Sequence, residues 1–324
     1  MVHSSNCISM ALPKKVQCLL CGSTEARRLD RVSPAEVVCL FAAEGVLLTT
    51  EAMDSFSGVA NIEHRQCLVC GFQFFDPILP GNNAFYRDLE NQVLGYYPEN
   101  SPSFFRALDL ARQTGAKTLM DLGCGAGRFL DKARAAGLKT YGLDLNEQAV
   151  EKARSRGHEV LCCTAESYAA SRPENRFDLV TAFEVMEHLS DPVGFFNGAA
   201  RLVKPGGHLA IAVPNGAGIY RWFTLDPRQW PPHHLSRWRA QDLRHLGGTL
   251  GLEVIDLTAD LLRGVQIRET WRMQSHYNLI LKRPDRYSSW IVREVLTFLY
   301  RLSLTRHYLR FGNSLHAHYR KPAT

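Results

Sequence analysis

Several familiar signals are missing from this 324-residue sequence. It contains no apolar run long enough to cross a bilayer, so we expect no membrane-spanning helix. Residues 1–15 lack a basic start followed by an apolar stretch, so we predict no secretory signal and a cytoplasmic protein. Internal repeats and low-complexity tracts are also absent, which excludes a solenoid or a disordered chain. The 45% hydrophobic content is that of an ordinary globular protein.

An excess of positive charge is absent from most of the chain, although the net charge is +6. Residues 263–324 contain 12 Lys and Arg against 3 Asp and Glu, which gives +9, so the preceding residues sum to −3. The simplest interpretation is a solvated basic face near the C-terminus. Because the central region is not basic and shows no aromatic–basic platform, we do not expect a nucleic-acid partner.

Part of this basic segment has apolar residues at helical spacing. Over residues 287–310 they alternate with arginines, which predicts an amphipathic helix packed on the domain. The helix would belong to a helical insertion at 261–310, before the last strand. A weak contact with a membrane surface or a lipid-linked substrate through residues 284–311 is an alternative, as is binding of a partner protein.

Four of the nine cysteines form two C-x-x-C pairs, each followed by glycine: Cys18 with Cys21, and Cys67 with Cys70. In a reducing compartment such pairs favour a metal site over a disulfide framework. Four thiolates suit a closed tetrahedral site, and the glycine turns let backbone amides face the sulfurs. We predict structural Zn²⁺ here, with a redox pair or unrelated buried cysteines as the alternatives.

From residue 116 onward, strand-like and helix-like segments alternate. Strands are expected at 117–123, 139–145, 159–165, 177–185, 207–214, 251–260 and 311–321. Helices are expected at 128–137, 146–157 and 239–251. This alternation implies an α/β fold with a parallel sheet covered on both faces. We predict a zinc-ribbon-like module at 1–80, a linker or helical cap at 81–115, and the α/β domain at 116–324.

The segment DLGCGAGRFL lies where the first of these strands meets a helix. Gly123, Gly125 and Gly127 permit positive φ and let a ligand approach the backbone. The third glycine comes one residue too early for the dinucleotide fingerprint, and Asp121 precedes the loop. An acid there suits a ligand with positive charge, such as an amino group near a sulfonium. Asp144 ends the next strand and is placed to accept hydrogen bonds from two ribose hydroxyls.

Four ordered blocks, DLGCGAG, GLDLN, FDLVTAFEVMEHLSDP and LVKPGGHLAIAVPN, resemble the class I S-adenosylmethionine-dependent methyltransferases. The resemblance covers about residues 116–260 and the final strand. It implies a Rossmann-like sheet of seven strands, the last antiparallel, and S-adenosylmethionine as cofactor. The cofactor-binding residues that we expect are Asp121, Gly123, Cys124, Gly125, Asp144, Leu145, Ala165, Glu166 and Glu184.

Within that set, the family pattern assigns parts of the cofactor. Asp121 and the first two glycines would line the methionine part, Asp144 would hold the ribose, and Leu145 would pack on the adenine. Many relatives have an aspartate contacting the adenine amino group where Thr164 stands.

The cysteine pairs ahead of this domain resemble one subgroup, the sugar C-methyltransferases of antibiotic deoxysugar pathways and methyltransferases of bacterial polysaccharide clusters. In that pattern residues 85–97 follow the zinc module and help to close over the substrate. The sugar C-methyltransferases carry a further C-terminal α/β domain for which 324 residues leave no room, so O-methylation is at least as compatible. The resemblance implies a small-molecule acceptor, a sugar or a glycoconjugate intermediate.

The stretch QWPPHHLSRW places two prolines directly before His233 and His234. In the subgroup, a histidine in a similar segment faces the acceptor; His234 matches it, and His233 occupies a place often held by Glu. A neutral imidazole is a suitable proton acceptor near pH 7. We therefore assign the catalytic role to His234, with His233 beside it. The alternative is a histidine hydrogen-bonded at a helix start, with Ser236 as the N-cap.

A metal site is a further alternative. In FEVMEHL, Glu184, Glu187 and His188 would share one face of a helix. With His234 they resemble the two-Glu, two-His magnesium site of plant-type small-RNA 2′-O-methyltransferases, and ubiquinone-pathway O-methyltransferases share the Glu-x-x-Glu-His element. The alternatives are thus a metal-dependent O-methyltransferase of a quinone-type or RNA hydroxyl, and a non-catalytic binding protein. The acceptor, the methylated atom and the oligomeric state stay open.

Overall fold

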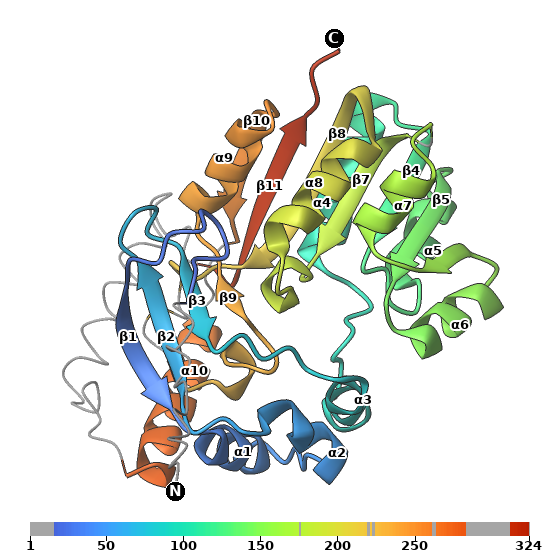
Figure 1. Ribbon diagram of the computed structural model, residues 1–324. Helices are drawn as coiled ribbons and strands as arrows, with labels where there is room; N and C mark the ends of the chain where they lie inside the picture. Colours follow the sequence, from blue (N-terminus) through green and yellow to red (C-terminus); the bar gives the residue numbers. More distant parts are fainter. Residues whose placement is uncertain are drawn as a thin grey trace, which may run out of the picture.

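The computed structural model describes residues 16–174, 176–218, 221, 224–260, 264–282 and 312–323. The amphipathic helix predicted over 287–310, and the lipid contact predicted through 284–311, lie outside these residues. Within them the chain forms a larger and a smaller sheet, with helices packed around both (Figure 1). No helix in this described part is long and apolar enough to span a membrane.

The larger sheet has seven strands in the order β10-β11-β8-β7-β4-β5-β6. Their bounds are β4 (Thr118–Leu122), β5 (Lys139–Asp144), β6 (Glu159–Cys162), β7 (Phe177–Phe183), β8 (Val203–Pro214), β10 (Glu253–Ala259) and β11 (Ser314–Arg320). Neighbouring strands from β6 to β8 are parallel, whereas β11 is antiparallel to both β8 and β10. The predicted Rossmann-like sheet of seven strands is confirmed, with its last strand antiparallel.

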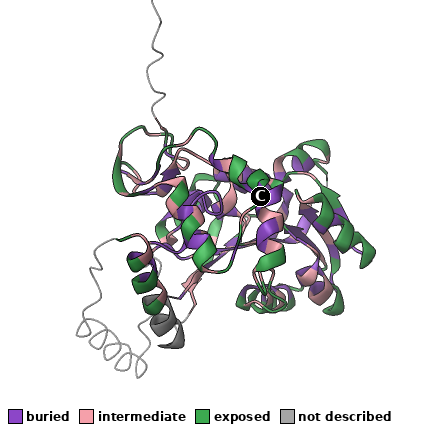
Figure 2. Cartoon of the chain, turned by 90° about the horizontal axis from the view of Figure 1, so that it is seen from below, coloured by how far each residue is buried: buried purple, intermediate pink, exposed green. Residues whose placement is uncertain are grey.

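Helices cover both faces of this sheet, which explains its apolar central strands. They are α4 (Pro102–Thr114), α5 (Arg128–Ala135), α6 (Glu147–Ser155), α7 (Ala165–Ser171), α8 (Pro192–Leu202) and α9 (Ala240–Thr249). Leu119 and Met120 of β4, like Leu179 and Val180 of β7, are at most 1% exposed. Figure 2 shows this division: the strands are buried and the outward sides of the helices are exposed.

Local capping sets where several of these helices begin. Asn146 accepts hydrogen bonds from backbone amides at the start of α6, and Thr164 does the same for α7. Asp191 caps α8, whose first residue is Pro192. The sequence pattern did not predict α7 or α8 as helices, although Thr164 and Asp191 are residue types that favour the start of a helix.

The smaller sheet joins the N-terminal region to a segment far along the chain. Its order is β1-β2-β3-β9, with bounds β1 (Ala26–Val32), β2 (Ile62–Cys67), β3 (Gln73–Asp76) and β9 (Ser236–Arg237). The pairing of β3 with β9 sets Phe74 opposite Ser236. The prediction that Ser236 caps a helix is therefore wrong, because this pairing holds its backbone extended. Helix α9 begins four residues later, where the Asp242 carboxylate accepts from the Arg239 amide.

Five further helices among the described residues pack around the smaller sheet. They are α1 (Pro34–Ala43), α2 (Thr50–Met53), η1 (Asp54–Phe56), α3 (Asn83–Gln92) and α10 (Gly264–Ile280). Phe41, Phe85, Trp230 and Tyr277 share one buried cluster, so α1, α3 and α10 pack around a common core. Helix α10 lies in the predicted insertion before the last strand, and α3 and α4 form within the predicted cap at 81–115. The domain boundaries themselves stay predictions.

Gly198 of α8 provides a test of this packing. A Cβ there would lie 2.8 Å from the Glu166 backbone nitrogen of α7, whereas a Cβ on Gly248 of α9 meets no atom within 4 Å. We expect Gly198→Ala to lower the free energy of unfolding by about 1–3 kcal/mol through overpacking. Gly248→Ala should raise it by about 0.5–1 kcal/mol, because the helix then loses less backbone entropy on folding. Urea denaturation of both variants measures the difference, and equal effects would contradict the close packing of α7 on α8.

Candidate functional site

The loop between β4 and α5 is the part of the structure best suited to a nucleotide-like ligand. Gly123 has φ +77°, and a side chain there would collide with Val185. The amides of Gly123 and Cys124 donate to the Leu143 carbonyl oxygen at 2.7 and 3.0 Å, which fixes the loop against β5. The next glycine, Gly125, has φ +52°. Glycine is therefore required at this bend by conformation and by space.

Asp144, at the end of β5, faces this loop. Its Oδ2 accepts a hydrogen bond from the Gly125 amide at 2.7 Å, and its Oδ1 accepts from the Asn146 amide at 2.8 Å. Burial raises the pKa of this carboxyl. Each oxygen keeps a second lone pair for a ligand hydroxyl. The adjoining Leu145 side chain is 59% exposed and offers an apolar surface beside them.

Asp121 is buried more deeply than a residue that simply lines a cleft. Its side chain is 3% exposed and accepts a hydrogen bond from the Thr181 hydroxyl at 2.7 Å. Burial raises the pKa of Asp121 to about 7. A cation bound nearby would favour the ionised carboxylate and would itself be stabilised by it.

The remaining predicted cofactor residues differ in what they offer. Cys124 is buried beneath the loop, with its thiol against Gly142, so only its backbone is available at the bend. Ala165 is buried and begins α7, and Glu166 is half-buried beside it. Thr164 is engaged in capping that helix through the Ser167 amide.

Glu184 follows β7 with φ +54°, a strained backbone for a residue with a side chain. Its Oε1 accepts a hydrogen bond from the Ser314 hydroxyl of β11 at 3.1 Å. The side chain is accessible to solvent, yet desolvation by the surrounding protein raises the pKa of the Glu184 carboxyl. The carboxylate thus lies at the same edge of the sheet as Asp121 and Asp144, as predicted from the strand ends.

Three histidines form a cluster next to this edge. His188 ends η2 (Met186–His188), and His233 and His234 follow η4 (Pro227–Gln229). The rings of His233 and His234 are stacked with centroids 4.5 Å apart, and His188 is 4.7 and 5.0 Å from them. One potential ligand nitrogen from each ring lies within 4.8 Å of the others. The structure therefore brings both predicted catalytic histidines to one point and adds His188.

Hydrogen bonds to carbonyl groups fix two of these rings. The Nδ1 of His188 lies 2.6 Å from the His233 carbonyl oxygen, and the Nδ1 of His233 lies 2.9 Å from that of Arg228. Each Nδ1 must therefore carry a proton and donate. The Nε2 of His233 then accepts from the Tyr96 hydroxyl at 2.8 Å. In the described part of the chain, the buried Nδ1 of His234 has no hydrogen-bond partner.

The cluster is electrically neutral at physiological pH. Burial lowers the pKa of His188 to about 4. Burial, followed by the neighbouring imidazoles and then by Arg228, holds the pKa values of His233 and His234 well below the usual range. Neutral imidazoles can accept protons or bind metals. Sequence reasoning named neither Tyr96 nor its contact, although it placed 85–97 near the substrate.

The Glu-x-x-Glu-His element does not form one helical face. Glu184 belongs to the strand end, whereas Glu187 lies within the short η2 turn and is 1% exposed. Neither carboxylate oxygen of Glu187 has a hydrogen-bond partner among the described residues, and one lies 3.6 Å from the His188 Nε2. Burial, and then the charge of Glu184, raise the pKa of Glu187 well above its usual range.

The four paired cysteines lie close together where β2 of the smaller sheet ends at Cys67. The Sγ atoms of Cys18 and Cys70 are 3.6 Å apart, as are those of Cys21 and Cys67, and all four lie within 4.8 Å. Tetrahedral Zn–S bonds of about 2.3 Å require sulfur separations of about 3.8 Å, so the four thiols fit such a site. Burial opposes the Cys67 thiolate, but hydrogen bonds from the Cys70 and Val69 amides outweigh it and lower its pKa to about 7.

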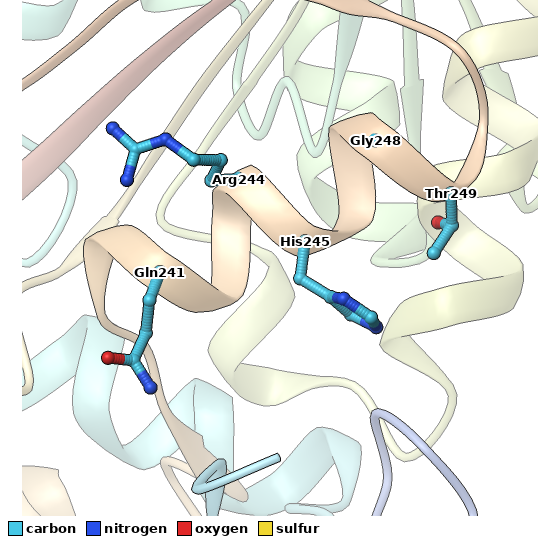
Figure 3. Close-up of a pocket in the computed structure, with 5 residues that line it drawn as sticks. All are labelled: Gln241, Arg244, His245, Gly248 and Thr249. Carbon is cyan, nitrogen blue, oxygen red and sulfur yellow. The ribbon is translucent and has the colours of Figure 1, made fainter.

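A separate hollow lies on α9 and contains none of the predicted residues. It is lined by Gln241, Arg244, His245, Gly248 and Thr249 (Figure 3). All five belong to one helix, and the Arg244 and His245 side chains point in different directions. The hollow therefore lacks the convergent polar groups of a binding site.

Comparison with known proteins identifies the family of the α/β domain. A family model described as methyltransferase domain matches residues 96–257, half of the chain. The chain belongs to the methyltransferase domain family. The matched residues include Asp121, Asp144 and the histidine cluster. S-adenosylmethionine is accordingly the cofactor that this methyltransferase domain is built to bind, as the sequence resemblance implied.

Each individual relative matches only part of this chain. A ubiquinone biosynthesis O-methyltransferase of Thiobacillus denitrificans is 35% identical over 123 residues, 36% of this chain and 53% of the relative. One from Vibrio cholerae is 31% identical over 134 residues, 40% and 54% of the two chains. The chain thus spans about half the length of these relatives. A SAM-dependent methyltransferase structure from Archaeoglobus fulgidus aligns with a TM-score of 0.49 at 17% identity, covering 74% of this chain and all of that one.

The buried Asp121 gives a prediction for cofactor binding. Protonation removes the charge that faces the cationic cofactor, and the free carboxyl has a pKa of about 7. We expect affinity for S-adenosylmethionine to be constant above pH 8 and to fall up to tenfold per pH unit below 7. Isothermal titration calorimetry from pH 5.5 to 8.5 measures this dependence. Asp121→Asn should bind more weakly and lose that slope; an equal slope in the variant would assign it to another group.

Proposed function

We propose that this protein transfers a methyl group from S-adenosylmethionine to a hydroxyl group of a small molecule, with His234 as the general base. The observation that supports this most strongly is the buried Nδ1 of His234, a ring nitrogen in a neutral cluster that has no hydrogen-bond partner among the described residues. One contact links this cluster to the glycine loop. Val185 limits the space at Gly123 and directly precedes η2, which ends at His188.

The protein's part in such a reaction is alignment and proton transfer. When bound, S-adenosylmethionine supplies an already activated sulfonium methyl group. The glycine loop and Asp144 would hold the donor, and the acceptor hydroxyl would lie between it and His234. His234 would take the hydroxyl proton as the oxygen attacks, since its lowered pKa keeps it unprotonated at neutral pH. Burial of the cluster would exclude competing water.

The acceptor that this site suits best is a neutral phenolic ring, as in a quinol. The rings of Phe85, Tyr86 and Tyr96 lie 5.8 to 6.3 Å from that of His233, so the cluster has aromatic walls. The Glu184 carboxylate would disfavour an anionic group near the reaction centre. The names of the ubiquinone O-methyltransferase relatives support O-transfer to such a ring.

A sugar or glycoconjugate hydroxyl is the second candidate. The observation that favours it is the four-cysteine cluster, since a zinc module ahead of the catalytic domain resembles the sugar-modifying subgroup. Mass spectrometry of products from matched catechol and nucleotide-sugar acceptors separates the two. Methylation of only the sugar would overturn the phenolic assignment.

His234→Ala tests the base. We expect kcat to fall roughly 10²–10⁴-fold while the affinity for cofactor changes little, because the side chain acts on the acceptor. His245→Ala, which alters an exposed histidine of α9, is the matched control and should retain full turnover. Stopped assays with radiolabelled cofactor measure both. Turnover of His234→Ala within twofold of the wild type would reduce His234 to a structural residue.

A divalent cation is the second candidate mechanism at the same place. His188, His233 and His234 have one potential ligand nitrogen each within 4.8 Å, although the His233 Nε2 would have to give up its hydrogen bond from Tyr96. The Glu187 carboxyl group, which has no hydrogen-bond partner among the described residues, lies beside them. Such a cation would be held by imidazole nitrogens and would polarise the acceptor hydroxyl. If His234 acts as the base without a cation, we expect turnover after mild chelation of labile cations to stay within twofold of the untreated protein. A loss restored by added Mg²⁺ or Co²⁺ would assign the cluster to metal binding.

We also propose that the four cysteines bind one structural Zn²⁺ per chain. The 3.6 Å sulfur separations and the two glycine turns support a closed thiolate site. We expect metal analysis to give one zinc, and Cys67→Ser to lose it together with several kcal/mol of stability. Cys39→Ser changes an exposed cysteine outside the cluster, and this variant should keep both the zinc and the wild-type stability. Zinc retained by Cys67→Ser would place the metal elsewhere.

A further inference from the structure

Two adjacent tyrosines lie between the donor side and the acceptor side of the site. Tyr96 and Tyr97 follow α3, and their ring centroids are 5.0 Å apart at an angle of 76°. Because the rings are nearly perpendicular, neighbouring residues can contact different parts of the site. Figure 1 shows α3 and the chain after it below the larger sheet, between the two parts of the molecule.

Tyr96 contacts the histidine cluster. Its hydroxyl lies 2.8 Å from the His233 Nε2, and the His233 Nδ1 is committed to the Arg228 carbonyl oxygen. The hydroxyl must therefore be the donor, and burial keeps it protonated by raising the pKa of Tyr96 well above its usual range. Between them, these two bonds fix both the orientation and the tautomer of His233. His234 stacks on that ring at 4.5 Å.

Tyr97 contacts the cofactor loop. Its ring is 3.7 Å from the position that a Cβ on Gly125 would take. It is also close enough to Asp144 for that carboxylate to contribute, after burial, to a raised pKa of the Tyr97 hydroxyl. The ring thus lies over the backbone of Gly125, whose amide donates to the acid that is placed to hold the ribose end of the donor.

Ion pairs and hydrogen bonds tie this segment to both parts of the molecule. Glu90 of α3 pairs with Lys152 of α6 at 2.7 Å, and Glu99 pairs with Arg128 at the start of α5 at 2.8 Å. The Gln92 side chain exchanges two hydrogen bonds with the Leu47 backbone. The tyrosine pair is therefore held against the donor-binding helices on one side and against the N-terminal region on the other.

We propose that Tyr96 is a positioning residue that fixes His233, and thereby the stacked His234, while Tyr97 contacts the bound donor. The pair connects the two half-sites through adjacent residues of one chain segment. This inference rests on the proposed methyl transfer for its catalytic consequence, but both contacts can be measured without turnover.

The tautomer of His233 is the first measurement. Long-range ¹H–¹⁵N spectra of histidine-labelled protein should show His233 protonated only on Nδ1 in the wild type. Tyr96→Phe removes the donor while keeping the ring, and we expect the Nε2 resonance to shift or the tautomers to mix. A His233 spectrum unchanged in Tyr96→Phe would overturn the positioning role.

Donor affinity is the second measurement. We expect Tyr97→Ala to raise the Kd for S-adenosylhomocysteine roughly tenfold in isothermal titration, and Tyr96→Phe to leave it within twofold. Tyr277→Phe is the matched control: Tyr277 is a buried tyrosine of α10 whose hydroxyl has no partner among the described residues, and its loss should change neither readout. A Kd that is unchanged or lowered in Tyr97→Ala would overturn the donor contact.

Turnover then separates this inference from the proposed function. If methyl transfer takes place, Tyr96→Phe should lower kcat roughly fivefold at unchanged donor affinity, as expected for one lost hydrogen bond. If no acceptor is methylated by the wild type, the proposed function fails, while the tautomer and affinity results still decide the tyrosine contacts. If Tyr96→Phe alters the tautomer of His233 but keeps the wild-type kcat, the proposed link between this hydrogen bond and catalysis is overturned.

Discussion

The arrangement of the whole molecule depends on the backbone of one buried residue, Leu235. Its amide donates to the Glu187 carbonyl oxygen at 2.7 Å, and its carbonyl accepts from the Phe75 amide at 3.1 Å. One peptide segment therefore joins the turn after β7 to the third strand of the smaller sheet. The preceding residues are the histidine pair. Any displacement of this segment would move the cluster away from the strand ends that form the cofactor side.

The loop that contains Leu235 also helps to bury two of the three histidines without charge. The His233 carbonyl oxygen accepts the ring proton of His188, and the Arg228 carbonyl oxygen of η4 accepts that of His233, so no carboxylate is needed to hold these two rings. Glu187 lies nearby without a hydrogen-bond partner in the described part of the chain, an arrangement that costs stability in a folded protein. Such costs are concentrated at functional sites, where a ligand or a transferred proton supplies the missing partner.

The sequence was sufficient for the larger sheet because its signals are local. Glycines at the bend, acids at strand ends and apolar strands follow one another within a few residues, and all seven strands lie where the pattern placed them. The failures came from distant contacts. Ser236 has the character of a helix cap, but its pairing with Phe74 prevails. Tyr96 carries no local signal, since its partner is 137 residues away. The four thiols were predictable because C-x-x-C spacing fixes each pair, whereas only the fold brings the pairs together.

The fourth strand of the smaller sheet has a consequence for synthesis on the ribosome. Strand β3 emerges about 160 residues before its partner β9. During that interval its outer edge has no partner strand, a condition that invites association with other chains. Closing so long a loop is also slow, because pairing between distant segments must wait for the intervening chain. The N-terminal region can therefore complete its sheet only after most of the larger domain has been made, and the exposed edge is prone to aggregation until then.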